Sequence, residues 1–495
     1  MQPNATHTFI SAGIAALGCT FILIQYGYNR SLWLDESLLA VNLIQKDYRA
    51  LLLPLDHNQV APILFLWIER FFVQFFGPGE MSLRAFPVLC ALLSIVLFWN
   101  VSRKIIPDDA TRLLALALFV LSPSFVYFAT EVKQYMADVL VLLAVYHALL
   151  SSFRYRMAVL SLLGVVSLFL SHAGVLILFT AAIYLLCESS GKHVPVRARY
   201  AVIPVFAIWL AGFTVCYVLF IDGHPHRGEM MNYWQQAFPP GNLISRDFVV
   251  WSLKKTIMLF TGILAFPEEY RLFIPFIGVY VAGVAHLVRT KKYALLFLLT
   301  FPVLLHAVIA YFRVYPFDHR LILYQLPLFV LTISIGFGTV KDALVHVTGL
   351  SRAPLLFLLP AGIYLFQILR DFPVEREEIK RSIRFMNESV APVDAVYVYH
   401  GAAEAFRYYR ETGRVAFGNP AVFGRRHDGY PEVFAADIAP FRGRTWVLFS
   451  HLNPFQTQAE ASFILDYCSG RGVLLKSFET TGSAVYLFDL QTDKR

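Results

Sequence analysis

Charged residues are scarce in this sequence. Asp, Glu, Lys and Arg make up only 15% of the 495 residues, whereas hydrophobic residues make up 57%. Soluble domains carry roughly 25% charged residues, so an ordinary soluble protein is excluded. With a mean hydropathy of +0.57, the composition predicts a polytopic helical membrane protein. The net charge of +8 does not indicate nucleic-acid binding, because most basic residues fall in short connections between apolar segments, where they set orientation.

Cysteines and the common catalytic motifs are few as well. The five cysteines have neither the spacing of a metal site nor that of a disulfide framework. The polar C-terminal part contains no nucleophile elbow and no glycine-rich phosphate loop. Chemistry is therefore expected near the membrane segments rather than in that part.

Apolar segments of about 20 residues, the length that crosses a bilayer, recur along the first 370 residues. They are 8–28, 84–102, 112–130, 134–152, 200–221, 271–288, 293–312, 321–340 and 353–369. Residues 157–187 are too long for one span and contain "SHAG", which predicts two short spans with a hairpin at Gly174. The segment 60–77 is apolar too, but Glu69 and Arg70 lie in its middle.

The positions of the basic loops decide how 60–77 is treated. Short cytoplasmic loops collect Lys and Arg, and five such loops alternate in sidedness only if 60–77 lies along the outer interface. Glu69 and Arg70 would then face headgroups or water. This choice predicts about eleven spans and a cytoplasmic N-terminus. It also places three segments on the outer face, 29–83, 130–134 and 222–270.

From residue 371 the sequence becomes polar. "RDFPVEREEIKRSIRFMN" predicts a charged amphipathic helix, and "DAVYVYH", "RTWVLFSH" and "SAVYLFDL" predict short strands, with a helix around "QAEASFILDYC". We therefore predict a transmembrane domain over 1–370 and a small extracytoplasmic α/β domain over 371–495. The loop "FGRRHDGY" within it is interpreted as solvated.

Polar residues that could carry chemistry converge on the predicted outer face. Two are adjacent acids in "SLWLDES", and the others come from "LDHNQVAP", "EMSLRAFP", "EVKQY" and "DHRLILY". The candidates are Asp35, Glu36, His57, Asn58, Arg84, Glu131, Lys133, Tyr135 and Arg320. A purely structural interpretation is that the adjacent acids mark the polar edge of an interfacial helix, and that Glu131 and Lys133 are interfacial anchors.

Sugar transfer from a polyprenyl phosphate fits this set of residues. The leaving group is a stable phosphate anion, so it needs positive charge rather than a general acid. The acceptor hydroxyl needs a general base, which one carboxylate supplies. A second acid could orient a substrate or hold a divalent cation. The lipid tail explains why so polar a cluster lies on membrane spans.

The order of these elements resembles the GT-C glycosyltransferases, which include the protein O-mannosyltransferase family (glycosyltransferase family 39) and the lipid A aminoarabinose transferases. The resemblance covers roughly residues 1–340. It implies that Asp35 is the catalytic base with Glu36 beside it, that Glu131 is the second acidic site, and that Arg84 opens the second span. It further implies that Arg320 reaches the lipid phosphate.

The chain also departs from those families. It has no lysine near "NQVAP" and no lectin-like domain in a later loop, and its C-terminal domain matches neither family. The expected partners are a polyprenyl-phosphate sugar donor, a glycan, lipid or protein acceptor, and the bilayer. The expected location is the inner (plasma) membrane.

Other interpretations stay open at this point. A transporter or flippase of lipid-linked sugars would make no covalent bond, but such carriers usually place ionisable residues near mid-bilayer. In the long outer loop, His224, His226 and Glu229 could bind a metal if the chain turns at Pro225. Trp234 in the same loop could stack on a sugar or anchor at the headgroups.

Overall fold

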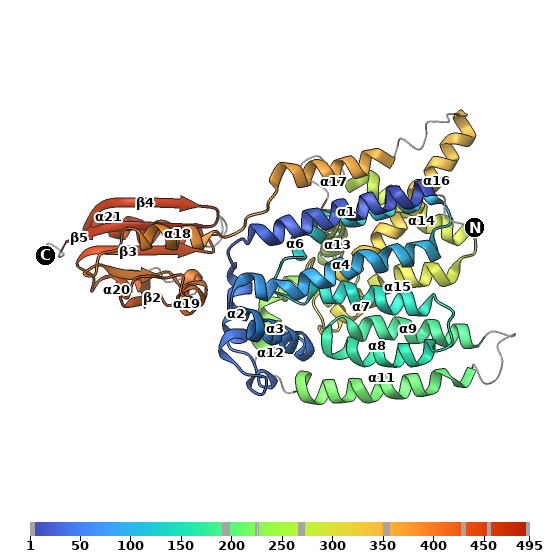
Figure 1. Cartoon of the computed structure of the whole chain (residues 1–495), viewed down its shortest axis with the longest axis horizontal. Helices are drawn as coiled ribbons and strands as arrows, with labels where there is room; N and C mark the ends of the chain where they lie inside the picture. The colour runs from blue at the N-terminus through green and yellow to red at the C-terminus, as the bar shows by residue number, and fades with distance from the viewer. Residues whose placement is uncertain are drawn as a thin grey trace.

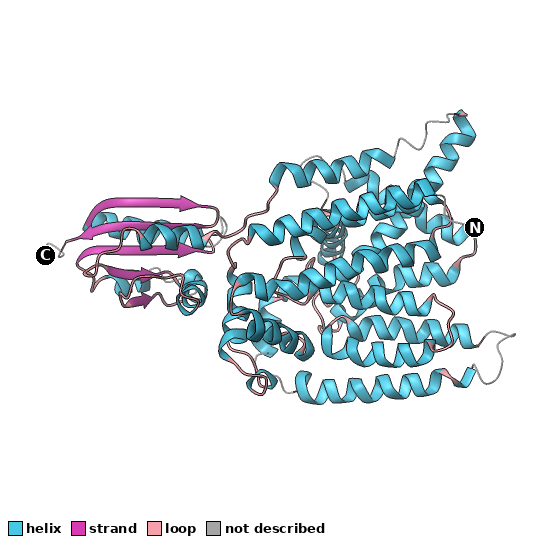
Figure 2. Cartoon of the chain, in the orientation of Figure 1, coloured by secondary structure: helices cyan, strands magenta, loops and turns pink. Residues whose placement is uncertain are grey.

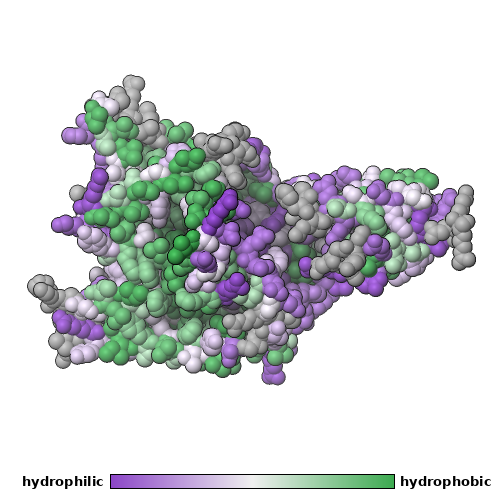
Figure 3. Space-filling model, turned by 180° about the vertical axis from the view of Figure 1, so that it is seen from behind, coloured by the Kyte–Doolittle hydropathy of each residue, from purple (hydrophilic) through white to green (hydrophobic). Residues whose placement is uncertain are grey.

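Apolar helices make up most of the chain in the computed structural model, and a small sheet domain follows at the C-terminal end (Figures 1 and 2). The structure describes residues 5–190, 199–222, 225, 227–265, 273–349, 357–426, 432–452 and 457–491. In the view of Figure 1 the N-terminus and the C-terminal domain lie at opposite ends of the molecule. Figure 3 shows apolar side chains gathered over the flank of the bundle, and polar ones toward the narrowing before the C-terminal domain.

The first 371 residues form helices of very different lengths. In chain order they are α1 (Ala5–Tyr28), α2 (Leu34–Gln45), α3 (Ile63–Phe76), α4 (Glu80–Ile105), α5 (Asp109–Val120), α6 (Pro123–Phe128), α7 (Tyr135–Leu149), α8 (Arg156–Leu170), α9 (Gly174–Ser189), α11 (Val202–Cys216), α12 (Arg227–Tyr233), α13 (Arg246–Met258), α14 (Phe273–Arg289), α15 (Tyr293–Tyr311), α16 (Leu326–Thr348) and α17 (Leu358–Asp371). Short 3-10 or π-helical turns adjoin several of them.

Five of the described helices are long and apolar enough to cross a membrane, and four shorter apolar helices accompany them. The predicted total of about eleven spans stays a prediction. The predicted division of 157–187 is confirmed, since α8 ends at Leu170 and α9 begins at Gly174. A Cβ on Gly174 would lie 2.4 Å from the carbonyl oxygen of Ser167, so the close turn requires glycine.

The single span predicted over 112–130 is wrong. The chain forms α5 up to Val120 and then a separate α6 from Pro123. Proline lacks an N–H and crowds the preceding turn, so it is favoured at the first position of a helix, which Pro123 occupies. Ser122 caps the new helix by accepting a hydrogen bond from the amide of Phe125 at 3.4 Å.

The expectation that Glu69 and Arg70 face headgroups or water is wrong for Glu69, while Arg70 is half-buried. In α3 the Glu69 side chain is fully buried, and within the described residues neither of its oxygens has a hydrogen-bond partner. Arg70 donates to the backbone oxygens of Leu43 and Ile44 at 2.8 and 3.1 Å. The helix therefore turns Glu69 and Arg70 toward α2 and α4, against which it packs, and exposes Phe71, Phe75 and Phe76.

The C-terminal domain is a five-stranded sheet in the order β2-β1-β3-β5-β4. Its elements are α18 (Ile379–Asn387), β1 (Ala395–Val398), α19 (Ala403–Glu411), β2 (Ala421–Phe423), α20 (Glu432–Ile438), β3 (Gly443–Ser450), α21 (Thr457–Arg471), β4 (Gly472–Thr480) and β5 (Ser483–Leu490). Strands β2, β1 and β3 are parallel, and β5 pairs antiparallel with both β3 and β4. The three predicted strands are confirmed, while β2 and β4 were not predicted.

The amphipathic helix predicted over 370–387 begins only at Ile379, where it is α18. Residues 372–378 are not helical, since Pro373 cannot continue α17. This non-helical link joins the bundle to the sheet domain, and Glu377 and Glu378 within it are buried. In the predicted solvated loop, the described residue Arg425 pairs with Asp437 at 2.6 Å, while 427–430 lie outside the described residues.

Candidate active site

The two adjacent acids lie in the first turn of α2, at the end of the bundle that faces the C-terminal domain (Figure 1). Successive residues of an α-helix point about 100° apart, so the two side chains enter different surroundings. A helix N-terminus also favours negative charge. The sequence thus places one carboxylate inward and one toward the edge of the protein.

Glu36 is the inward carboxylate and is fully buried. Arg84 contacts it at 3.0 Å and Arg30 at 3.6 Å. Its oxygens also accept from the amides of Val132 at 2.9 Å and of Trp33 at 3.3 Å. Burial raises the pKa of Glu36, but Arg30 and Arg84 lower it by more, so the pKa lies below its usual value and the group is held as a carboxylate. Its acceptor capacity is used by the protein itself.

Asp35 is the outward carboxylate and keeps 18% of its side chain exposed. It forms an ion pair with Arg320, which lies between α15 and α16. Burial raises the pKa of Asp35, but Lys133 and Arg320 outweigh burial and hold it below its usual value. The carboxylate is therefore ionised and partly exposed.

Trp33 connects these acids with the second predicted acidic position. Its indole N–H donates to Oε1 of Glu131 at 3.2 Å, and Glu131 is fully buried. Among the described residues, Oε2 of Glu131 has no hydrogen-bond partner. Burial and the nearby Glu36 raise the pKa of Glu131, against the opposing effect of Arg30. One acceptor atom of this second acid is thus left unused.

Lys133 and Tyr135 lie at the start of α7, on the same side as Asp35. The Lys133 ammonium donates to Oε1 of Gln59 at 2.6 Å and is 7% exposed. Burial lowers the pKa of Lys133, and Asp35 opposes that shift. Tyr135 is 4% exposed and packs edge-on against Phe128. The "EVKQY" stretch therefore contributes both a cation and an aromatic wall.

The other two residues from the "LDHNQVAP" stretch contact different parts of the chain. His57 contacts Glu404 of α19 at 3.3 Å, and Asn58 donates to Glu229 of α12. Both have left-handed backbone conformations, with φ of 61° and 55°. Glu404 and Glu229 are thus outside the Asp35 cluster, and substrate binding by His57 and Asn58 stays a prediction.

The structure adds residues that sequence reasoning missed. Arg376, in the link to the C-terminal domain, stacks on the Trp33 ring at 3.3 Å and donates to the Tyr127 hydroxyl at 2.9 Å. Arg320 lies over the rings of Trp33 and Trp234 at 5.7 and 5.0 Å. Trp33 lies in the "SLWLDES" stretch directly before the two acids, so its position in the sequence was a signal for a site residue. No local pattern marked Arg376.

A metal site finds no support in the described part of the chain, where no three His, Cys, Asp or Glu side chains cluster suitably. His224 and His226 of the predicted metal site lie outside the described residues. Glu229, the third residue, is bonded to Asn58. The divalent cation therefore stays an untested expectation.

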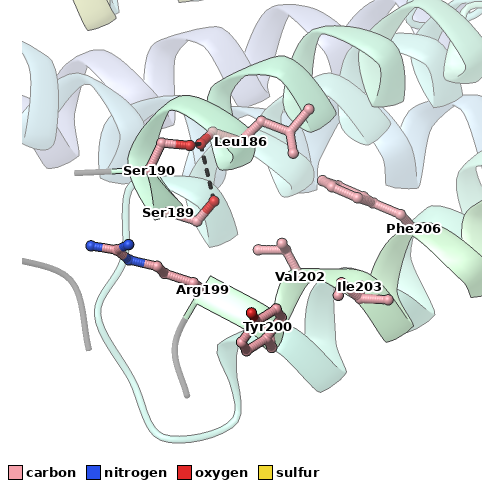
Figure 4. A pocket seen from close by; sticks show the side chains of 8 residues that line it. All are labelled: Leu186, Ser189, Ser190, Arg199, Tyr200, Val202, Ile203 and Phe206. Carbon is pink, nitrogen blue, oxygen red and sulfur yellow. Dashed lines mark hydrogen bonds between the residues drawn. The ribbon is translucent and has the colours of Figure 1, made fainter. Parts of the chain in front are cut away.

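A hollow of about 370 Å³ lies between the ends of α9 and α11, lined by Leu186, Ser189, Ser190, Arg199, Tyr200, Val202, Ile203 and Phe206 (Figure 4). The hydroxyls of Ser189 and Ser190 both donate to the carbonyl of Leu186. These helix ends lie at the end of the bundle away from α2 (Figure 1). The hollow contains none of the candidate catalytic residues.

The chain is similar to known proteins in part of its sequence and in its fold. Residues 60–218 match the sequence model of the dolichyl-phosphate-mannose-protein mannosyltransferase family. The crystal structure of ArnT from Cupriavidus metallidurans bound to undecaprenyl phosphate is similar, with a TM-score of 0.56 at 11% identity over 98% of each chain. The apo state of that protein gives a TM-score of 0.42 at 11% identity, over 96% of this chain and 98% of that one. No curated protein matches the sequence.

The chain therefore has the predicted GT-C fold, and residues 60–218 resemble the mannosyltransferase family. The family model covers the stretch from α3 to the end of α11, which contains Arg84, Glu131 and Lys133. The predicted small C-terminal sheet domain is part of the confirmed fold.

Proposed function

We propose that this protein transfers a sugar from a polyprenyl-phosphate donor to an acceptor hydroxyl at the outer face of the membrane, with Asp35 as the general base. The observation that carries the proposal is the ion pair of Asp35 with Arg320 beside Lys133. Two cations around one ionised carboxylate leave a positive surplus. Such a surplus suits a phosphate.

The pair with Arg320 gives the base a resting state. A carboxylate that a guanidinium holds is a weak proton acceptor, as the low pKa of Asp35 indicates. A donor phosphate that binds Arg320 and Lys133 would compete with Asp35 for these cations. Binding of the donor would therefore release the carboxylate and raise its basicity where the acceptor arrives.

The transfer step then needs only residues already described. The acceptor oxygen forms a bond to the anomeric carbon while its proton passes to Asp35. The bond between the anomeric carbon and the phosphate oxygen breaks, and the electron pair leaves with the polyprenyl phosphate. Arg320 and Lys133 stabilise that leaving anion. No second carboxylate is required as a nucleophile in an inverting displacement.

The remaining predicted residues fall into supporting roles. Glu36 and Arg84 are bonded to each other and to backbone, so we assign them to holding the shape of the site rather than to proton transfer. Glu131 offers its unused oxygen to a sugar hydroxyl, and Trp33 orients it. Tyr135 lines the site.

The lipid part of the donor is supported by the likeness to ArnT, whose crystal structure holds undecaprenyl phosphate. The positions of the basic loops support an arrangement with the N-terminus in the cytoplasm and the site and C-terminal domain outside. The sugar and the acceptor class are left open within glycan, lipid or protein.

Binding of undecaprenyl phosphate to the purified full-length protein in lipid nanodiscs tests the donor half of the proposal. Arg320→Ala should weaken binding at least about tenfold, the usual scale for removing a charge-assisted contact. Arg313→Ala is the matched control, since Arg313 lies exposed in the same connection between α15 and α16. Equal binding by wild type and both variants would contradict the role of Arg320.

A further inference from the structure

The backbone before the two acids is held by the C-terminal domain and its link. The amide of Ser31 donates to Glu378 at 3.3 Å, and the amide of Leu34 donates to Glu377 at 3.0 Å. Between them, the amide of Leu32 donates to the Tyr409 hydroxyl at 2.8 Å. These partners are more than 340 positions away along the chain.

Most other backbone groups of this segment are also satisfied by fixed side chains. The amide of Trp33 donates to Glu36, as described above. Arg84 donates to the carbonyls of Arg30 and Ser31 at 2.6 and 3.3 Å, and Lys380 donates to that of Asn29. A segment with its amides and carbonyls paired in this way has little freedom to move.

The C-terminal partners are themselves supported from behind. Glu377 contacts His451 at 2.7 Å, at the end of β3. The amide of Glu378 donates to the carbonyl of Thr481 at 2.8 Å, in the turn between β4 and β5. Tyr409 belongs to α19 and is fully buried. Glu377, Glu378 and Tyr409, which we call the brace, therefore connect the sheet domain with the start of α2.

We propose that the C-terminal α/β domain is a positioning device for the catalytic base, acting through Glu377, Glu378 and Tyr409 on the backbone of residues 31–34. The inference rests on the proposed function, because it assigns the brace to holding Asp35. General-base catalysis depends on placement, and a displacement of about 1 Å can cost on the order of 100-fold in rate. The hydrogen bonds of these three residues go to the backbone of the segment and not to the Asp35 side chain, so each acts through the segment.

The chain offers a matched pair of variants. Tyr409→Phe removes the acceptor of the Leu32 amide. Tyr408→Phe removes a hydroxyl of equal burial on the same helix, which donates to the carbonyl of Pro78 at 2.6 Å instead. The first variant removes a hydrogen bond to the backbone of residues 31–34, and the second leaves the hydrogen bonds of that segment in place. Glu377→Ala compared with Glu377→Gln gives a second pair, since the amide oxygen of glutamine can still accept from Leu34.

Hydrogen exchange of the full-length protein measures the brace directly. Tyr409→Phe should speed exchange of the Leu32 amide about tenfold, the equivalent of one lost hydrogen bond. Tyr408→Phe should leave it unchanged. Exchange in Tyr409→Phe equal to that in wild type would overturn the brace.

Transfer and donor binding measured together separate positioning from general damage. Transfer, scored by mass spectrometry of envelope glycans and lipids in a complemented deletion strain, should fall about tenfold in Tyr409→Phe and Glu377→Ala. Undecaprenyl phosphate binding should stay at the wild-type level, and Glu377→Gln should recover most of the transfer. If wild type and Asp35→Asn give the same glycans, the proposed function fails. If those two differ but Tyr409→Phe matches wild type, only the positioning role fails.

Discussion

Replacing Glu36 by glutamine tests whether the two adjacent acids have different jobs. The change keeps the size of the side chain and removes its charge. It leaves Arg30 and Arg84, each 1% exposed, without their buried counter-charge. Glutamine also has one acceptor oxygen where Glu36 has two, and those two now serve the amides of Val132 and Trp33.

The structure sets the size of the effect. Removing one partner of a buried ion pair costs about 3–5 kcal/mol, and an amide left without its acceptor adds about 1 kcal/mol. Folded proteins are stable by only about 5–15 kcal/mol. Glu36→Gln should therefore lower the free energy of unfolding by a large fraction of the total, and the midpoint of thermal unfolding by on the order of 5 °C.

The assay is thermal unfolding of the purified protein in detergent, with Asp35→Asn as the control. That variant makes the same chemical change one residue earlier, but the Asp35 and Arg320 side chains keep 18% and 12% of their surface exposed. Its stability loss should be smaller, because water can reach part of both side chains and screens the charge that is left on Arg320. The reasoning is refuted if Glu36→Gln unfolds at the wild-type temperature.

Three further predictions concern the support of the site and its titrating groups. Gly482 has φ of +66°, and a Cβ there would lie 2.5 Å from the carbonyl oxygen of Arg376. Gly482→Ala should therefore displace the link and lower transfer. Gly470→Ala is the control and should leave transfer unchanged, because a Cβ there would have open space around it. In the free enzyme Lys133 and Arg320 outweigh burial and keep the pKa of Asp35 low, so the acid limb of kcat/KM should lie below the ordinary aspartate value. Lys133→Gln should move that limb to higher pH, and an unmoved limb would contradict the effect of Lys133 on Asp35. Burial raises the pKa of Glu69, so the folded protein holds the proton, and stability should fall as the pH rises above the unfolded value of about 4.3. Glu69→Gln should therefore unfold at a higher temperature than wild type at pH 8 and at a similar temperature near pH 4. If the difference in unfolding temperature between the variant and wild type were the same at both pH values, the burial of an unpaired acid would be contradicted.

Much of the membrane region could be predicted from the sequence, because apolar length is a local signal. The division of 157–187 followed from "SHAG", and the strands of the C-terminal domain followed from alternating apolar residues. The break before Pro123 was missed because the surrounding stretch is uniformly apolar and was treated as one span. Burial of Glu69 was missed because a charge in an apolar segment is ordinarily cheaper at the interface.

The candidate site was predictable only in part, because local sequence signals do not encode contacts between distant parts of the chain. Asp35, Glu131 and Arg320 could be grouped because the ends of successive spans meet at one face. The two roles of the adjacent acids depend on which way each helical side chain points, and that is settled by Arg30 and Arg84 in the folded chain. Arg376 reaches Trp33 across more than 300 residues, and no periodicity or spacing encodes such a contact.

The measurement that bears most directly on Asp35 as the base is comparative mass spectrometry of envelope glycans and lipids. A deletion mutant of the native host would be complemented with wild type or with Asp35→Asn, at equal protein abundance. We expect one glycan or lipid to lose a single sugar in the deletion mutant and only wild type to restore it, which would also identify the sugar and the acceptor. Full restoration by Asp35→Asn would contradict its role as the base.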